Sequence, residues 1–212
     1  MVRNHGRNPM RESIAHLAAR LMAEDGIEDY ARAKRKASRQ LGASDARQMP
    51  NNDEIDAALR QYRQLYQQDH AAELLELRRL ALAIMREFAP YNPCLTGSVL
   101  RGSAGKYAGI ELHLYCDNAK SVEHYLLGQD IRFRSAELQL YAGEMSLVAP
   151  VLIFDRDGYD IHLTLLSSRD RRLALKTSVA GNPLERAKTE AVAALVAGMQ
   201  DPGTNRSATD SG

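Results

Sequence analysis

The sequence has few of the residues that mark specialised classes of protein. Its 212 residues include no tryptophan, three phenylalanines and two cysteines. A low aromatic content disfavours the binding of single-stranded nucleic acid by base stacking. Cys94 and Cys116 supply neither a disulfide framework nor the spacing of a zinc site, so we interpret both as core residues of strands.

Long apolar runs and a strong excess of charge are also absent. No stretch approaches the roughly eighteen apolar residues of a membrane-spanning helix, and the N-terminus lacks the apolar core of a secretory signal. The net charge is +1, so overall electrostatics do not predict a polyanionic partner. We therefore expect a protein of a bacterial-type cytoplasm with no membrane partner.

Three common catalytic motifs are missing from the sequence. Gly105-Lys106 has no P-loop context, because Leu100 occupies the place of the first glycine and Tyr107 that of the Ser/Thr. Neither the Gly-x-Ser-x-Gly nucleophile motif nor the His-Glu-x-x-His zinc motif occurs. These absences disfavour enzymes that depend on those motifs.

What the sequence does have is a change of hydrophobic period near Pro93. Before it, apolar residues at helical spacing predict a helical N-terminal region, 1–89, with helices near 14–25, 28–41, 52–66 and 70–88. After it, alternation predicts strands, with one helix near 119–127 and a last helix near 184–196. The expected strands are Cys94–Thr96, Ile110–Cys116, Ile131–Arg134, Leu138–Ala142, Leu147–Phe154 and Tyr159–Leu165.

This order predicts an α+β fold, in which a small mixed β-sheet with helices on one face occupies residues 90–198. Residues 199–212 are rich in Pro, Gly, Ser, Thr and Asn and are expected to form a disordered tail.

A Gly-Ser turn and a later strand carry the strongest functional signal. Twelve residues separate Thr96-Gly97-Ser98 from the alternating segment Glu111-Leu112-His113-Leu114. This layout resembles the nucleotidyltransferase superfamily that includes DNA polymerase β, in a divergent bacterial branch. That family has aspartates where this chain has Glu111 and His113. The resemblance covers about residues 91–166.

The resemblance implies roles for particular residues. Glu111, His113 and Asp160 correspond to the catalytic, metal-binding set, and His162 shares a strand face with Asp160. The implied cofactor is a divalent metal, Mg²⁺ or Mn²⁺, with a nucleoside triphosphate. The implied nucleotide-binding residues are Gly97, Ser98, Arg101 and Lys106.

The altered motif leaves three interpretations open. Histidine replaces a bridging aspartate poorly at a magnesium centre, so the site is either inactive as a transferase or has a changed metal preference. The third interpretation is that these polar residues are simply the solvated face of a sheet.

A basic stripe in the second expected helix offers a different function. Its other members lie three, four and seven positions after the first and so share one helix face. Such a stripe either tracks a phosphate backbone or forms a solvated surface. The residues are Arg32, Arg35, Lys36 and Arg39.

We therefore expect a nucleotidyltransferase-like protein, weak or inactive as a transferase, that binds a nucleotide or a phosphorylated partner. One alternative is an active, metal-dependent transferase of nucleoside monophosphates. The other is a non-catalytic adaptor that binds RNA or protein through the basic stripe.

Overall fold

The computed structural model describes residues 9–24, 27, 29–43, 48–66, 69–105, 108–179 and 181–200. The chain forms two compact units that divide between Ala71 and Ala72. The division falls near the start of helix α4 (His70–Glu87), whereas the expected boundary at 89/90 follows the end of that helix. The division lies earlier because the apolar residues of α4 pack in the core of the second unit. Within the described residues, no helix is both long enough and apolar enough to span a membrane.

The first unit is helical, as the 3.6-residue period predicts. Helix α1 (Pro9–Glu24) packs against both α2 (Tyr30–Gln40) and α3 (Asn52–Tyr66). Its core combines small and branched apolar residues, among them Ile14, Ala18, Ala33, Ala37, Ile55 and Leu59. The small alanines allow the three helix backbones to lie close together.

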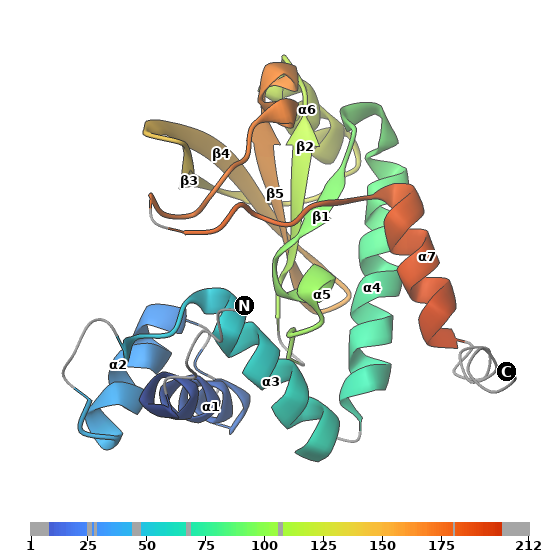
Figure 1. The fold of residues 1–212 in the computed structure, drawn as a ribbon. Helices are drawn as coiled ribbons and strands as arrows, with labels where there is room; N and C mark the ends of the chain where they lie inside the picture. The colour runs from blue at the N-terminus through green and yellow to red at the C-terminus, as the bar shows by residue number, and fades with distance from the viewer. Residues whose placement is uncertain are drawn as a thin grey trace, which may run out of the picture. The chain divides into compact units, whose positions relative to one another are not determined.

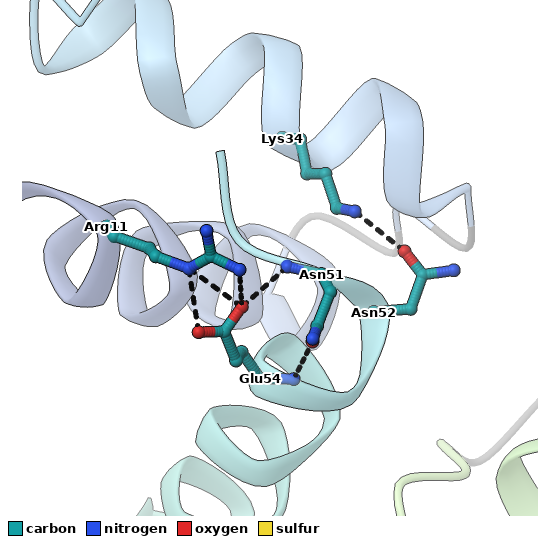
Figure 2. A network of polar contacts seen from close by, with 5 residues as sticks. All are labelled: Arg11, Lys34, Asn51, Asn52 and Glu54. Carbon is teal, nitrogen blue, oxygen red and sulfur yellow. Dashed lines mark hydrogen bonds and ion pairs between the residues drawn. The ribbon is translucent and has the colours of Figure 1, made fainter. Parts of the chain in front are cut away.

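The start of α3 is tied to both other helices of the first unit (Figure 2). Arg11 of α1 donates from Nε and Nη2 to the Glu54 carboxylate, at 2.8 and 2.7 Å. Asn51 and Glu54 form a reciprocal cap, in which each side chain accepts from the other residue's backbone N–H. Lys34 of α2 donates to Asn52 Oδ1 at 2.8 Å. The hydrogen bond from Arg11 is the main cause that lowers the pKa of Glu54 below its ordinary value.

The second unit is built on a mixed sheet with the strand order β3-β4-β5-β2-β1-β6, and Figure 1 labels strands β1 to β5. Strand β2 (Ile110–Tyr115) pairs antiparallel with β1 (Cys94–Thr96) and parallel with β5 (Tyr159–Leu166). Strand β4 (Met145–Arg156) runs antiparallel to both β5 and β3 (Arg134–Ala142). The two-residue strand β6 (Ala187–Lys188) pairs with β1. The fold is therefore α+β, as predicted.

Helices cover one face of this sheet. Three helices, α4, α6 (Ala119–Gly128) and α7 (Thr189–Gln200), contribute to the main apolar core of this unit. They do so through side chains such as Ile84, Leu126 and Val192. These side chains pack on the inward-facing members of the central strands, including Leu95, Leu112, Leu114 and Leu163. This apolar layer holds β1, β2 and β5 in register beneath the candidate site.

The other sheet face is partly covered by the chain that follows β5. A short 3₁₀ helix, η3 (Ser168–Arg172), leads into a segment whose Leu173, Leu175 and Leu184 pack with Tyr115 and Leu166. A bridge between Tyr141 and Lys176 fixes this segment at the far strand, with N–O distances of 2.9 and 2.8 Å.

The β3–β4 hairpin extends past the rest of the sheet. Strand β4 pairs with β3 from Met145 to Ile153, but it pairs with β5 only from Val151 to Arg156. Pro150 stands at the point where the β5 ladder ends.

Several element bounds differ from the expected ones. Residues 131–133 are not a strand, and 134–142 form one continuous strand where two short ones were expected. The last helix begins at Thr189, because the residues before it cross the sheet and form β6. It runs through Gln200, so residues 199 and 200 are helical, and the remainder of the predicted tail lies outside the described residues.

Candidate functional site

The predicted Gly-Ser turn meets the predicted carboxylate at the end of β1. Thr96 pairs with Glu111, and the five-residue helix α5 (Gly97–Arg101) follows at once. Gly97 has φ +73°, and a Cβ placed there would lie 2.4 Å from Glu111 Oε1. A glycine is therefore required for two reasons: a left-handed backbone, and a carboxylate in direct contact with the first turn of α5.

Helix α5 is held from below by a buried arginine of α4. Arg78 donates from Nε to Val99 O at 3.1 Å and from Nη2 to Leu100 O at 2.8 Å. These are carbonyls near the end of α5, which the short helix cannot satisfy itself. Burial lowers the pKa of Arg78, yet it still supplies charge-assisted hydrogen bonds. Arg78 is thus a positioning residue for the turn.

The other predicted nucleotide-binding residues lie along α5 and beyond it. Ser98 and Arg101 are both half-buried, and the backbone oxygen of Ser98 accepts from Ser103 N at 3.0 Å. Lys106 lies outside the described residues. Gly97, Ser98 and Arg101 are therefore close in the chain and on one short helix, as expected from their spacing.

A row of polar residues crosses the sheet at this level. Glu111 lies between Thr96 on β1 and His162 on β5, and the Glu111 side chain is exposed. Asp160 lies on β5 two residues before His162, and its Oδ2 is 3.9 Å from His162 Nε2. Arg134 of β3 reaches the same Oδ2 at 3.0 Å. Glu111, His162 and Asp160 thus lie near the same end of the parallel strands β2 and β5, where the Arg134 guanidinium pairs with the Asp160 carboxylate.

His113 has a different environment from its predicted partners. It shares the strand face of Glu111, but only 2% of it is exposed. Its Nδ1 is buried with no hydrogen-bond partner among the described residues. Loss of solvation, and secondarily the positive charge of Arg186, lowers the pKa of His113 to about 4. The imidazole is therefore neutral at pH 7.

Arg186 explains why that part of the face is closed. It donates to Tyr115 OH at 2.6 Å and to the Leu173 carbonyl at 2.8 Å. The preceding residue, Glu185, accepts from the Thr96 hydroxyl through its backbone oxygen at 2.8 Å. The segment before β6 is thereby bound across the sheet next to His113.

The predicted metal ligands do not form one coordination sphere. Glu111 offers an exposed carboxylate, Asp160 is paired with Arg134, and His113 is buried. In the part of the chain that the structure describes, no group of three or more His, Cys, Asp or Glu side chains is arranged to hold a metal ion. Two-metal transfer needs carboxylates that bridge hard cations. The donor set does not fit such a centre.

The basic stripe of the first unit occupies the exposed face of α2. Arg32, Arg35, Lys36 and Arg39 are all exposed, whereas Ala33 and Ala37 are buried against the rest of the unit. Asp29 caps the helix by accepting from Arg32 N at 2.6 Å. The predicted sharing of one helix face is confirmed.

Sequence reasoning missed the arginines that organise the site: Arg78, Arg134 and Arg186. For Arg78 there was a signal, because it lies four positions after Leu74 and four before Leu82, on the apolar stripe of α4. A charged residue on such a stripe indicates a buried polar partner. The sequence held no comparable signal for Arg134 or Arg186, whose partners depend on tertiary folding.

Comparison of the chain with protein-family models, with curated proteins and with solved structures finds no match.

Proposed function

We propose that this protein binds a nucleotide or a phosphorylated ligand at the corner where Gly97 meets Glu111, and that it is weak or inactive as a nucleotidyltransferase. The contact between the Glu111 carboxylate and the first turn of α5 carries the proposal. An exposed acid thus lies next to a glycine turn on a neighbouring strand, and both residues belong to the motif that resembles nucleotidyltransferases.

The sheet connections support the same proposal. A Gly-Ser turn follows β1, β1 is antiparallel to β2, and β2 is parallel to the strand that carries Asp160. A nucleotidyltransferase-like core is a compact way to account for this order. Transfer itself is disfavoured, because His113 is buried and neutral and Asp160 is paired with Arg134.

The carboxylate of Glu111 repels a phosphate unless a cation lies between them. Binding of a nucleoside triphosphate at this corner should therefore require Mg²⁺ or Mn²⁺. Glu111→Gln keeps the size of the side chain and removes its charge. Glu137→Gln, on the exposed edge of β3, is the matched control.

Calorimetric titration with ATP, GTP, CTP and UTP tests this, with Mg²⁺, with Mn²⁺ and with EDTA. We expect metal-dependent binding by the native protein and by Glu137→Gln, and loss of that binding in Glu111→Gln. Incubation with labelled nucleotides should show no transfer above background. The absence of any binding component that depends on both the metal and Glu111 would refute the proposed site.

A second candidate function is favoured by one observation, the exposed cationic face of α2. On this proposal the first unit contacts the phosphate backbone of RNA. The salt dependence of RNA binding separates it from the nucleotide site, because Glu111 lies in the other unit.

A further inference from the structure

A polar hollow lies at the opposite end of β2 from Glu111. Strand β2 ends at Tyr115 and β5 at Leu166, and the chain beyond each strand forms the wall of the hollow. Its volume is about 990 Å³, at the upper end of the ~300–1,000 Å³ typical of ligand pockets. The lining residues are Asp117, Ser167, Ser168, Arg169, Arg171, Arg172 and Lys188.

The lining is strongly cationic. Arg169, Arg171, Arg172 and Lys188 are exposed, and Asp117 is the carboxylate among the lining residues. Across the described residues, these arginines and this lysine form no ion pair with a carboxylate. Cations gathered in a hollow repel one another, and an anionic ligand relieves that repulsion.

The acidic groups nearby already serve the backbone. Asp117 accepts from Ser168 N at 3.2 Å, and Asp170 forms a capping box with Ser167. Ser167 Oγ in turn accepts from Arg169 N at 3.3 Å. The amides at the start of η3 are thus satisfied within the protein, so a ligand would be bound by the side chains.

The backbone of η3 is tied to the sheet. Arg186 donates to Tyr115 OH at 2.6 Å and also reaches the Arg171 carbonyl at 3.4 Å. This links η3 to the end of β2. On the opposite side, Lys188 is held in the sheet by its pairing with Cys94. The cations therefore come from two separate elements that the fold brings to one hollow.

We infer that this hollow binds the oligophosphate chain of a nucleotide-sized ligand. Guanidinium groups bind phosphate oxygens through paired N–H donors, and several of them suit a chain of adjacent phosphates. Among the lining residues that the structure describes none is aromatic, so the ring-on-ring stacking that commonly holds a base is not offered there. The hollow thus recognises phosphates and not the base, and it needs no metal ion.

Calorimetry in EDTA with inorganic tripolyphosphate, ATP, GTP and adenosine tests the inference. We expect tripolyphosphate, ATP and GTP to bind with similar affinity and adenosine not to bind. Arg169→Gln/Arg171→Gln/Arg172→Gln should weaken tripolyphosphate binding about tenfold or more, the factor that corresponds to losing one charged hydrogen bond. The charge-matched control is Arg86→Gln/Lys120→Gln/Arg132→Gln, whose side chains are exposed in the same unit.

A second readout is independent of the triple variant. Tripolyphosphate should protect Lys188 from acetylation in the native protein, while Lys120 stays reactive. Glu111→Gln should leave tripolyphosphate binding in EDTA unchanged, which separates this site from the one in Proposed function. Equal weakening in the control, no binding by the native protein, or no protection of Lys188 would overturn the inference. If an RNA without a terminal triphosphate binds and tripolyphosphate does not, the inference is overturned and the hollow is assigned to nucleic acid instead.

Discussion

Removal of the buried histidine should change how stability depends on pH. His113 is 2% exposed and its Nδ1 has no hydrogen-bond partner within the described residues. Its neighbours across the strands are Cys94 and Thr164, and the Tyr115 ring centroid lies 6.5 Å from its own. The nearby charge is Arg186, which opposes protonation. Burial and Arg186 both disfavour the charged form, and within the described part of the chain no carboxylate is among the causes of the shift.

The magnitude follows from the two pKa values. The pKa of His113 is about 4 in the folded protein and 6.5 when unperturbed. Between these values the unfolded chain binds a proton that the folded chain rejects, so stability falls as the pH falls. The stability that comes from keeping His113 neutral is fully present above pH 6.5 and is lost as the pH falls towards 4. The difference corresponds to about 3 kcal/mol.

His113→Leu replaces the imidazole by a side chain of similar volume that cannot be protonated. Urea unfolding followed by circular dichroism, from pH 7.5 down to 4.5, gives the free energy of unfolding of each protein. Thiol labelling of Cys94, read by mass spectrometry, reports the second unit alone, because Cys94 is buried in its sheet. Between pH 7.5 and 4.5 the native protein should lose about 2–3 kcal/mol more free energy of unfolding than the variant does.

His124→Leu is the matched control, because His124 is exposed on α6. His124→Leu should change the loss of stability between pH 7.5 and 4.5 far less than His113→Leu does. If the native protein and His113→Leu lose stability in parallel between pH 7.5 and 4.5, His113 is protonated in the folded state, and its assignment as a neutral buried group is wrong.

The remaining predictions concern the turn, its support and the basic stripe. Gly97→Ala should destabilise the second unit by about 2 kcal/mol or more in urea unfolding, because the new Cβ meets Glu111 and the backbone is left-handed. Adding Glu111→Ala should recover only part of the lost stability. Full recovery would mean that the backbone of residue 97 is not strained. Arg78→Met should cost about 3 kcal/mol by leaving α5 carbonyls unsatisfied. Arg79→Met should cost less than about 1 kcal/mol, because its pair with Glu76 is exposed, and equal losses would contradict the positioning role. The residues of the α2 stripe are Arg32, Arg35, Lys36 and Arg39. Changing them to Gln should reduce the slope of the logarithm of RNA affinity against the logarithm of salt concentration by about one per lost phosphate contact, without moving the thermal midpoint. An unchanged slope would leave the stripe as solvated surface.

The helices and central strands were predictable because each depends on local period. The stripe from Leu74 to Met85 predicted α4, and the alternation from Ile110 predicted β2. Ile131 and Phe133 have the composition of a strand, but they have no strand partner and pack on the apolar cluster from a loop. Propensity alone cannot report the lack of a partner.

The site was predictable in its alternation and not in its burial. The period of two correctly placed Glu111 and His113 on one face of β2. It could not show that the segment containing Arg186 closes over His113 and leaves Glu111 exposed, because that segment follows β5 much later in the chain. The turn at Gly97 was likewise visible as a motif, whereas its contact with Glu111 required the antiparallel pairing of β1 and β2.

The protruding β3–β4 hairpin divides the sheet into parts with different local stability. At its base β4 is bonded on both sides, so its amides open only when the central sheet opens. Towards Met145 it is bonded to β3 alone, and the Tyr141–Lys176 bridge joins that end of the hairpin to the rest of the unit. Pro150 stands at the boundary and has no N–H to extend the ladder, which also discourages a foreign strand from adding along that edge. Amide exchange should therefore be fast in the hairpin tip and slow beyond Pro150, so that a single proline separates a strand end that opens readily from a strand end that belongs to the core.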